Sequence, residues 1–249
     1  MTGKVALVTG GGRGIGAACA MRLEALGATV AVADLEVGDG GGSRRLALDV
    51  ADAAAVGAAI EGLVEELGRL DVLVCAAGVL GDLESSTASR AGDADFATAL
   101  DVNLMGTVNC CRASARHLEA GGWGRIVTFT SLAALRPFER GLGAPYVTSK
   151  SAVIGYTLSL AAELGPAGVN VNAVAPGSID TPMTRSAFDD MDDDDAVSRL
   201  PIPRHGRPED CAGVVEFLCT PLSDYVTGQV IRVDGGLSLT DALSGSGLP

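Results

Sequence analysis

The sequence contains few aromatic, histidine and basic residues. Aromatic side chains make up 4% of the 249 positions, so a buried core has to consist mainly of Val, Leu, Ile and Ala, the residues that buried parallel strands favour. Histidine occurs only at His117 and His205, and the six cysteines lack a Cys-x-x-Cys spacing. We therefore expect no zinc or iron site, and we interpret the cysteines as small buried residues that stay reduced.

Acidic residues outnumber basic ones, with 31 Asp and Glu against 18 Lys and Arg and a net charge of −13. Binding to nucleic acid or to an anionic membrane surface needs clustered basic side chains, so we expect neither partner. The apolar runs are shorter than a membrane span. The first residues lead into an apolar strand without the layout of a signal peptide. The expected location is the cytoplasm.

Short apolar runs rich in Val and Ile alternate with longer helical patterns along the chain. This alternation predicts an α/β fold, a single doubly wound Rossmann-type domain over residues 1–249. Full helices are expected at Phe96–Leu118 and Val147–Leu164, on the faces of a parallel sheet of about seven strands. The expected strands are Val5–Thr9, Thr29–Asp34, Leu46–Asp49, Val72–Cys75, Ile126–Thr130, Val169–Val174 and Val230–Val233.

Three segments interrupt this alternation. Residues 35–45 are too rich in glycine for a helix, so we expect a short, irregular crossover there. Residues 184–200 hold Phe188 and Met191 among six aspartates, which predicts a mobile flap over the ligand cleft. The tail at 240–249 is expected to be flexible.

The first expected strand is followed by a glycine-rich turn and a helix. Glycines suit such a turn because it needs positive φ angles and a close approach of the backbone to a pyrophosphate, to which the helix N-terminus presents N–H groups. A Walker-type loop would end in Gly-Lys-Ser/Thr, and Ile15–Ala17 does not match it. We predict dinucleotide binding at Gly10, Gly12, Arg13, Gly14, Ile15 and Gly16.

Asp34 closes the second expected strand. A carboxylate at this position can accept both ribose hydroxyls of NAD and would repel the additional phosphate of NADP. Two alternatives remain: Asp34 is only a solvated strand-end residue, or Arg13 receives that phosphate. We favour NAD as the cofactor, because the two residues after Asp34 offer no basic side chain.

Four polar residues form a candidate catalytic set. Tyr146 and Lys150 are four residues apart and share one face of an expected helix. Ser131 follows an apolar strand, and Asn103 lies inside an expected helix although Asn is a poor helix former. Each residue alone has an ordinary alternative: Tyr146 is a surface residue of a helix, Ser131 caps the end of a strand, or Asn103 is an unusual residue inside a helix without a function. Together they predict an oxidoreductase in which the tyrosine handles a proton and the lysine adjusts its acidity.

Over essentially its full length the chain resembles the short-chain dehydrogenase/reductase family, single-domain branch. The resemblance implies that Tyr146 is the general acid/base and that Lys150 depresses the pKa of this phenol and holds the nicotinamide ribose. It also implies that Ser131 donates to the substrate oxygen and that Asn103 anchors a water that relays protons to Lys150. The matching motifs are Thr9–Gly16, Asp49-Val50, Ala76–Gly78, Asn103, Ser131, Tyr146-x-x-x-Lys150, Pro176-Gly177 and Val233–Gly236.

The resemblance further implies a homotetramer, formed through the two long helices and through Tyr225–Gly236. The implied contacts to the cofactor come from Asp49 and Val50 at the adenine, from Ala76, Ala77 and Gly78 along the cofactor, and from Pro176, Gly177, Ile179 and Thr181 over the nicotinamide.

Three features depart from the family pattern. Cys75 stands where an Asn is usual. The interval between Ser131 and Tyr146 is longer than typical, which makes Arg136 and Arg140 candidates for substrate contact, with solvated loop charges as the alternative. The short crossover at 35–45 is shared with some members that act on cyclic dihydrodiols.

The predicted function is hydride transfer between NAD(H) and a small-molecule secondary alcohol or ketone. One alternative is a catalytically silent dinucleotide-binding sensor or scaffold, which would not need the set of Asn103, Ser131, Tyr146 and Lys150. Alternatives within enzymes are a cyclic dihydrodiol dehydrogenase and a 3-oxoacyl-carrier-protein reductase. The aspartates within 189–195 would repel an acidic carrier protein.

Overall fold

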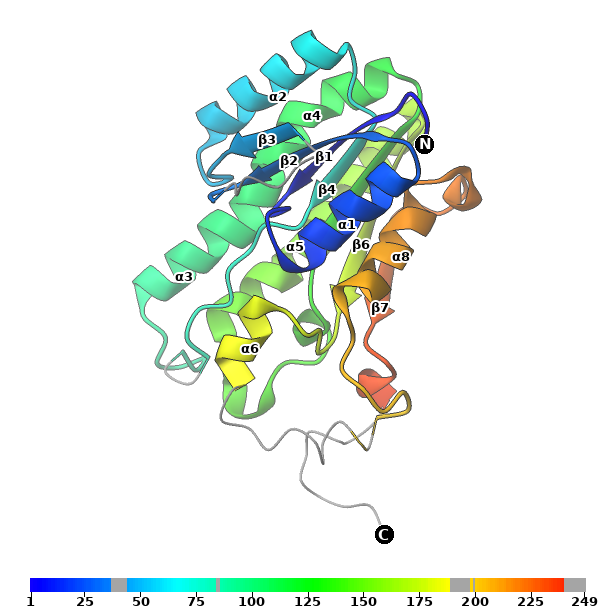
Figure 1. Cartoon of the computed structure of the whole chain (residues 1–249). Coiled ribbons are helices and arrows are strands. Elements are labelled where there is room, and N and C mark those ends of the chain that lie inside the picture. Colours follow the sequence, from blue (N-terminus) through cyan, green and yellow to red (C-terminus); the bar gives the residue numbers. More distant parts are fainter. Residues whose placement is uncertain (37–43, 84–85, 189–197, 199, 240–249) are drawn as a thin grey trace.

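One seven-stranded sheet organises the molecule in this computed structural model, which describes residues 1–36, 44–83, 86–188, 198 and 200–239 (Figure 1). All the strand pairs are parallel, and the order is β3-β2-β1-β4-β5-β6-β7. The doubly wound parallel sheet predicted from the sequence is confirmed. The strands are β1 (Val5–Thr9), β2 (Thr29–Asp34), β3 (Arg44–Ala47), β4 (Val72–Cys75), β5 (Gly124–Phe129), β6 (Val169–Pro176) and β7 (Val230–Val233).

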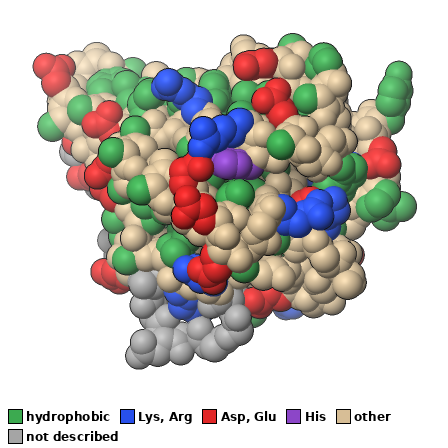
Figure 2. Space-filling view, turned by 90° about the horizontal axis from the view of Figure 1, so that it is seen from above, with side chains coloured by type: hydrophobic (Ala, Val, Ile, Leu, Met, Phe, Trp, Pro, Cys, Tyr) green, Lys and Arg blue, Asp and Glu red, His purple; other side chains and the backbone are tan. Residues whose placement is uncertain are grey.

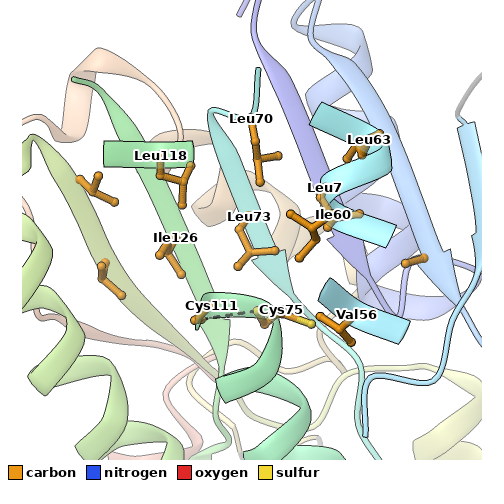
Figure 3. Close-up of a cluster of buried hydrophobic side chains, with 14 of the residues drawn as sticks. Leu7, Val56, Ile60, Leu63, Leu70, Leu73, Cys75, Cys111, Leu118 and Ile126 are labelled. Carbon is orange, nitrogen blue, oxygen red and sulfur yellow. Dashed lines mark hydrogen bonds between the residues drawn. The ribbon is translucent and has the colours of Figure 1, made fainter. Parts of the chain in front are cut away.

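Helices cover both faces of the sheet, because alternate residues of each buried strand point to opposite sides. Leu7 of β1 belongs to a core cluster with residues of α2 (Ala53–Leu67), α4 (Gly106–Ala120) and α5 (Ala144–Leu164) (Figure 3). Its neighbour Val8 belongs to the cluster formed with α1 (Gly14–Ala25) and α8 (Pro208–Leu218). Shorter helical segments are α3 (Asp93–Ala99), α6 (Pro182–Phe188), the π-helical Leu100–Met105, and the 3-10 turns Leu132–Ala134, Glu139–Gly141, Gly165–Ala167, Pro221–Ser223 and Leu237–Leu239.

Some predicted boundaries are wrong. β3 begins two residues before the predicted Leu46 and stops at Ala47, because its ladder with β2 ends where β2 itself ends. Asp49 therefore lies in the following loop, where its carboxylate accepts a hydrogen bond of 2.9 Å from the Ala51 N–H.

The expected helix at Phe96–Leu118 is divided by a π-helical segment. Of the predicted flap, residues 184–188 are helical in α6. Residues 37–43 of the crossover, the aspartates of 189–195 and the tail lie outside the described residues.

In the described part of the chain, no helix combines the length and the hydropathy that crossing a bilayer requires. Within the same residues, no group of three or more His, Cys, Asp or Glu side chains is arranged to hold a metal ion. On the face of the molecule shown in Figure 2, acidic and basic side chains lie next to one another.

At the amino ends of the central strands, charged side chains are held by one another. The buried Asp71 carboxylate accepts hydrogen bonds from Lys4 Nζ at 2.9 Å, from Arg69 Nε at 2.7 Å and from the Val5 N–H at 2.9 Å. Two cations lie over the Trp123 ring, with Lys4 Nζ 4.1 Å and the Arg125 guanidinium carbon 4.2 Å from the ring centre. We call this set of residues the amino-end cluster.

Candidate active site

A cleft of about 310 Å³ lies at the opposite edge of the sheet, where the strands end. It is lined by the turn between β1 and α1, by the ends of β2 and β4, by the start of α5 and by the segment after β6. Ligands of open parallel sheets bind at this edge. The predicted residues that line it are Gly10, Arg13, Gly14, Ile15, Gly16, Asp34, Asp49, Val50, Ala76, Ala77, Gly78, Ser131, Tyr146, Lys150, Pro176, Gly177, Ile179 and Thr181.

The turn after β1 fits a dinucleotide pyrophosphate. A Cβ atom at Gly16 would lie 2.1 Å from the carbonyl oxygen of Gly10, so no larger residue fits where the turn crosses the start of α1. Gly10 has a φ of +65°, and a Cβ there would lie 2.5 Å from the backbone nitrogen of Ala77. α1 has neither a side-chain cap nor an acidic residue in its first turn. Its N–H groups therefore face the cleft without a competing carboxylate, as an anion site requires.

Asp34 is held in place by the glycine turn. Its carboxylate accepts a hydrogen bond of 2.9 Å from the Gly12 N–H. A Cβ atom at Gly12 would lie 2.8 Å from the Asp34 Oδ2 atom. Gly12 is the one predicted cofactor residue that does not line the cleft, and its position instead orients the carboxylate that does.

Three of the four predicted catalytic side chains meet in the cleft. Ser131 follows β5, and its hydroxyl acts to lower the pKa of the Tyr146 phenol. The same hydroxyl accepts a hydrogen bond of 3.1 Å from the Ala133 N–H. Lys150, one helical turn after Tyr146, is buried and donates from Nζ to the Phe129 carbonyl at 2.9 Å.

The acidities of the tyrosine and the lysine are set mainly by burial. Burial raises the pKa of Tyr146, and the hydrogen bond with Ser131 acts in the opposite direction. Burial lowers the pKa of Lys150 to about 8. The expectation that Lys150 lowers the pKa of Tyr146 stays a prediction. The Lys150 Nζ atom lies 5.9 Å from the centre of the tyrosine ring and is engaged by a carbonyl, so desolvation of the phenolate dominates.

Asn103 lies behind the cleft, in the π-helical segment, and is fully buried. Its amide accepts from the Val79 N–H at 2.8 Å and donates to the Val79 carbonyl and to Ser149 Oγ, both at 2.9 Å. Ser149 in turn donates to the Tyr146 carbonyl at 2.8 Å. In this structure Asn103 thus joins the segment after β4 to the start of α5. The water that we expected it to anchor stays a prediction.

Sequence reasoning missed Val79 and Ser149, although Ser149 lies inside the stretch from Tyr146 to Lys150. Most of the other missed cleft residues are sequence neighbours of predicted ones, so their proximity to those residues was the available signal. The cleft residues that were not predicted are Ala33, Leu35, Leu48, Val79, Val102, Phe129, Thr130, Pro182 and Thr184.

The three departures from the family pattern have different outcomes. The Cys75 thiol is buried, with its sulfur 4.0 Å from that of Cys111 in α4 (Figure 3). Arg136 donates to the Leu237 carbonyl at 3.2 Å, and Arg140 is exposed with a φ of +56°. Neither arginine is among the described residues that line the cleft, so this structure gives no support for substrate contact. The crossover lies mostly outside the described residues.

Known proteins resemble this chain over nearly its whole length. Residues 10–238 match the family model described as Enoyl-(Acyl carrier protein) reductase. The chain is 44% identical to the short-chain reductase protein NovJ of Streptomyces niveus, with 93% of each chain covered. It is 42% identical to cyclohexanol dehydrogenase of Rhodococcus sp. (strain TK6), covering 96% of this chain and 97% of the relative. The ligand-free aldohexose dehydrogenase of Thermoplasma acidophilum superimposes with a TM-score of 0.90 at 29% identity, over 99% of this chain and 97% of that one.

Proposed function

Since the chain belongs to the short-chain dehydrogenase/reductase family of oxidoreductases, we propose that it interconverts a secondary alcohol and its ketone with NAD(H). The observation that carries this proposal is the meeting of Ser131, Tyr146 and Lys150 in the cleft that also holds the glycine turn. A family member binds a nicotinamide dinucleotide, which supplies or accepts the hydride.

The side chains of this protein then have distinct tasks. The Tyr146 hydroxyl exchanges a proton with the substrate oxygen, and the Ser131 hydroxyl donates a hydrogen bond to that oxygen. Lys150 holds the nicotinamide ribose, and its charge favours ionisation of the phenol. The glycine turn binds the pyrophosphate, with Asp49 and Val50 at the adenine and Ala76–Gly78 along the cofactor. Pro176, Gly177, Ile179 and Thr181 cover the nicotinamide.

The preference for NAD over NADP rests on Asp34. Its carboxylate faces the cleft from the end of β2 and is fixed by the Gly12 N–H. A phosphate on the adenosine ribose would approach this negative charge, whereas two ribose hydroxyls would donate to it. Arg13 also lines the cleft and supports the opposite preference. We give Asp34 more weight because it is held in place by a backbone hydrogen bond.

For the substrate we propose a neutral, cyclic secondary alcohol or ketone. The likeness to cyclohexanol dehydrogenase over nearly the whole chain supports this class. The net charge of −13 disfavours the approach of multiply anionic substrates. A catalytically silent dinucleotide sensor is less well supported, because it would have no need of a tyrosine and a serine that line the same cleft.

We also propose that the protein is a cytoplasmic homotetramer of single-domain subunits. Tyr225 is fully exposed before the edge strand β7, and Leu158 of α5 is 47% exposed. Both residues lie in the segments that the family resemblance assigns to subunit contacts. Sedimentation at micromolar concentration measures the assembly, and a monomer would contradict this proposal.

The main test follows NADH and NADPH oxidation at 340 nm with cyclohexanone, an open-chain ketone, an anionic keto acid and a 3-oxoacyl carrier protein. We expect turnover of cyclohexanone with NADH to be fastest. If the 3-oxoacyl carrier protein is turned over fastest, the proposed substrate class is wrong and the protein is a 3-oxoacyl-carrier-protein reductase. Binding of NADH without turnover of any ketone or of the matching alcohols would favour the silent sensor.

A further inference from the structure

The segment that leaves β6 and the segment that enters α8 are joined by a short parallel bridge between Ile179 and Gly206. The Asp180 N–H donates to the Gly206 carbonyl at 2.8 Å, and the Gly206 N–H donates to the Ser178 carbonyl at 2.9 Å. The Ile179 side chain packs directly over Gly206. A Cβ atom there would lie 2.3 Å from Ile179 Cδ1. Ile179 is therefore held against the backbone of the other segment.

A side-chain contact reinforces this bridge. Ser178 Oγ and His205 Nδ1 share a hydrogen bond of 2.9 Å. These two residues are not among those that line the cleft, whereas Gly177, Ile179 and Thr181 are. The hydrogen bond thus lies outside the cleft and holds the segment whose other residues form the cleft wall.

His205 is itself anchored to α8. Arg204 donates from Nη1 to the His205 carbonyl at 2.9 Å, and its guanidinium makes two hydrogen bonds, of 2.7 and 2.9 Å, with Asp210 in the first turn of α8. The Arg204 hydrogen bond and the Arg207 N–H lower the pKa of Asp210 to about 2. α8 packs its buried residues into the core against α1. A continuous set of contacts therefore runs from a core helix through His205 and Ser178 to the cleft.

We propose that His205 and Ser178 form a positioning pair, which holds Ile179 and Thr181 at the nicotinamide end of the cleft. This proposal rests on the proposed function, which places residues 176–181 over the nicotinamide. Neither residue of the pair contacts the reacting atoms. Their contribution is to keep the segment after β6 in one conformation before the cofactor arrives, which reduces the entropy lost on binding.

The test separates the nicotinamide end of the cofactor from the rest by comparing NADH with ADP-ribose, which lacks the nicotinamide. In His205→Ala the dissociation constant of NADH should rise about fivefold, the effect of losing one hydrogen bond, while that of ADP-ribose stays within about 1.5-fold. Titration calorimetry measures both. Equal weakening of both ligands, or a change of less than about twofold for NADH, would overturn the proposal.

Conservative variants make the test specific to one ring atom. An Asn side chain places a polar atom near the position of Nδ1, whereas Gln reaches the position of Nε2. His205→Asn should therefore restore NADH binding to within about twofold of the wild type, and His205→Gln should not. Rescue by Gln but not by Asn would show that the contact with Ser178 is not the one that matters.

Ser178→Ala should have the same effect as His205→Ala, and the double variant should be no worse than either single one, because both remove the same hydrogen bond. Additive effects would contradict a shared role. His117→Ala is the matched control, since this other histidine pairs with Glu61 on the α2–α4 side and should leave both ligands unaffected. Failure of the wild-type protein to bind NADH would instead refute the proposed function.

Discussion

The two edges of the sheet use polar groups in opposite ways. At the amino-end cluster, Asp71 accepts hydrogen bonds from Lys4, Val5 and Arg69, and two cations lie over the Trp123 ring. At the carboxyl ends, Ser131, Tyr146 and Asp34 face a cleft. The same kinds of group therefore stabilise the fold at one edge and await a ligand at the other. Substitutions at the two edges should separate folding free energy from activity.

The largest effect is expected for Tyr146→Phe. This change removes the hydroxyl that exchanges the proton and should lower kcat by about a hundredfold or more, roughly 2.7 kcal/mol. Cofactor affinity and the thermal midpoint should stay close to those of the wild type, because the ring remains. Steady-state kinetics and titration of NADH measure these quantities. Normal turnover in the variant would refute the proton-transfer role.

The converse result is expected for Asp71→Asn. Loss of the charge leaves Lys4 and Arg69 without their carboxylate and should lower the free energy of unfolding by about 2 kcal/mol, less than for a fully buried pair because both partners are partly exposed. The kcat should not change. Urea denaturation measures the effect, with Arg22→Ala as the control. Arg22 pairs with Glu216 at the surface and should contribute less than about 0.5 kcal/mol.

A smaller effect is expected for Asp34→Ala. The wild type should prefer NADH over NADPH by about tenfold in kcat/KM, roughly 1.4 kcal/mol, and the variant should lose most of this preference. Arg13→Ala serves as the comparison and should not increase the use of NADPH. A wild-type preference for NADPH would mean that Arg13, not Asp34, sets the choice of cofactor.

The smallest effect concerns the acid stability of the amino-end cluster. Burial acts to raise the pKa of Asp71, but hydrogen bonds from Arg69, Lys4 and the Val5 N–H outweigh it, and the folded-state pKa lies below its usual value of 3.8. Because the folded-state pKa is the lower one, the ionised carboxylate stabilises the fold. This stabilisation is complete above the unfolded-state pKa and is lost as the pH falls through the folded-state pKa. The difference in stability between the wild type and Asp71→Asn should therefore shrink below about pH 4. A difference that grows on acidification would contradict this sign.

The sequence predicted the sheet well because buried parallel strands leave a strong apolar signal, as at Val72–Cys75. It failed at β3, whose end is fixed by pairing with β2 and not by its own residues. The positions of Ser131, Tyr146 and Lys150 in one cleft were predictable from spacing and family motifs. The direction of the pKa change at Tyr146 was not, because burial depends on the packed structure.

The hydrogen bond between His205 and Ser178 is a second feature that could not be predicted from the sequence. The two residues are 27 positions apart, and neither belongs to a motif that indicates contact. Asn103 illustrates the intermediate case, since its poor helix propensity marked it as unusual, while its partners Val79 and Ser149 became apparent only in three dimensions.

The position of Trp123 gives the protein a built-in optical reporter. It is the only tryptophan in the chain and lies in the amino-end cluster, in contact with Lys4 and Arg125. Its emission spectrum therefore senses whether that edge of the sheet remains closed, while the intrinsic fluorescence of NADH senses the cleft. Trp123 emission and NADH fluorescence can be recorded from the same sample during denaturation. Coincident transitions of the two signals would show that both edges of the sheet unfold in a single cooperative event.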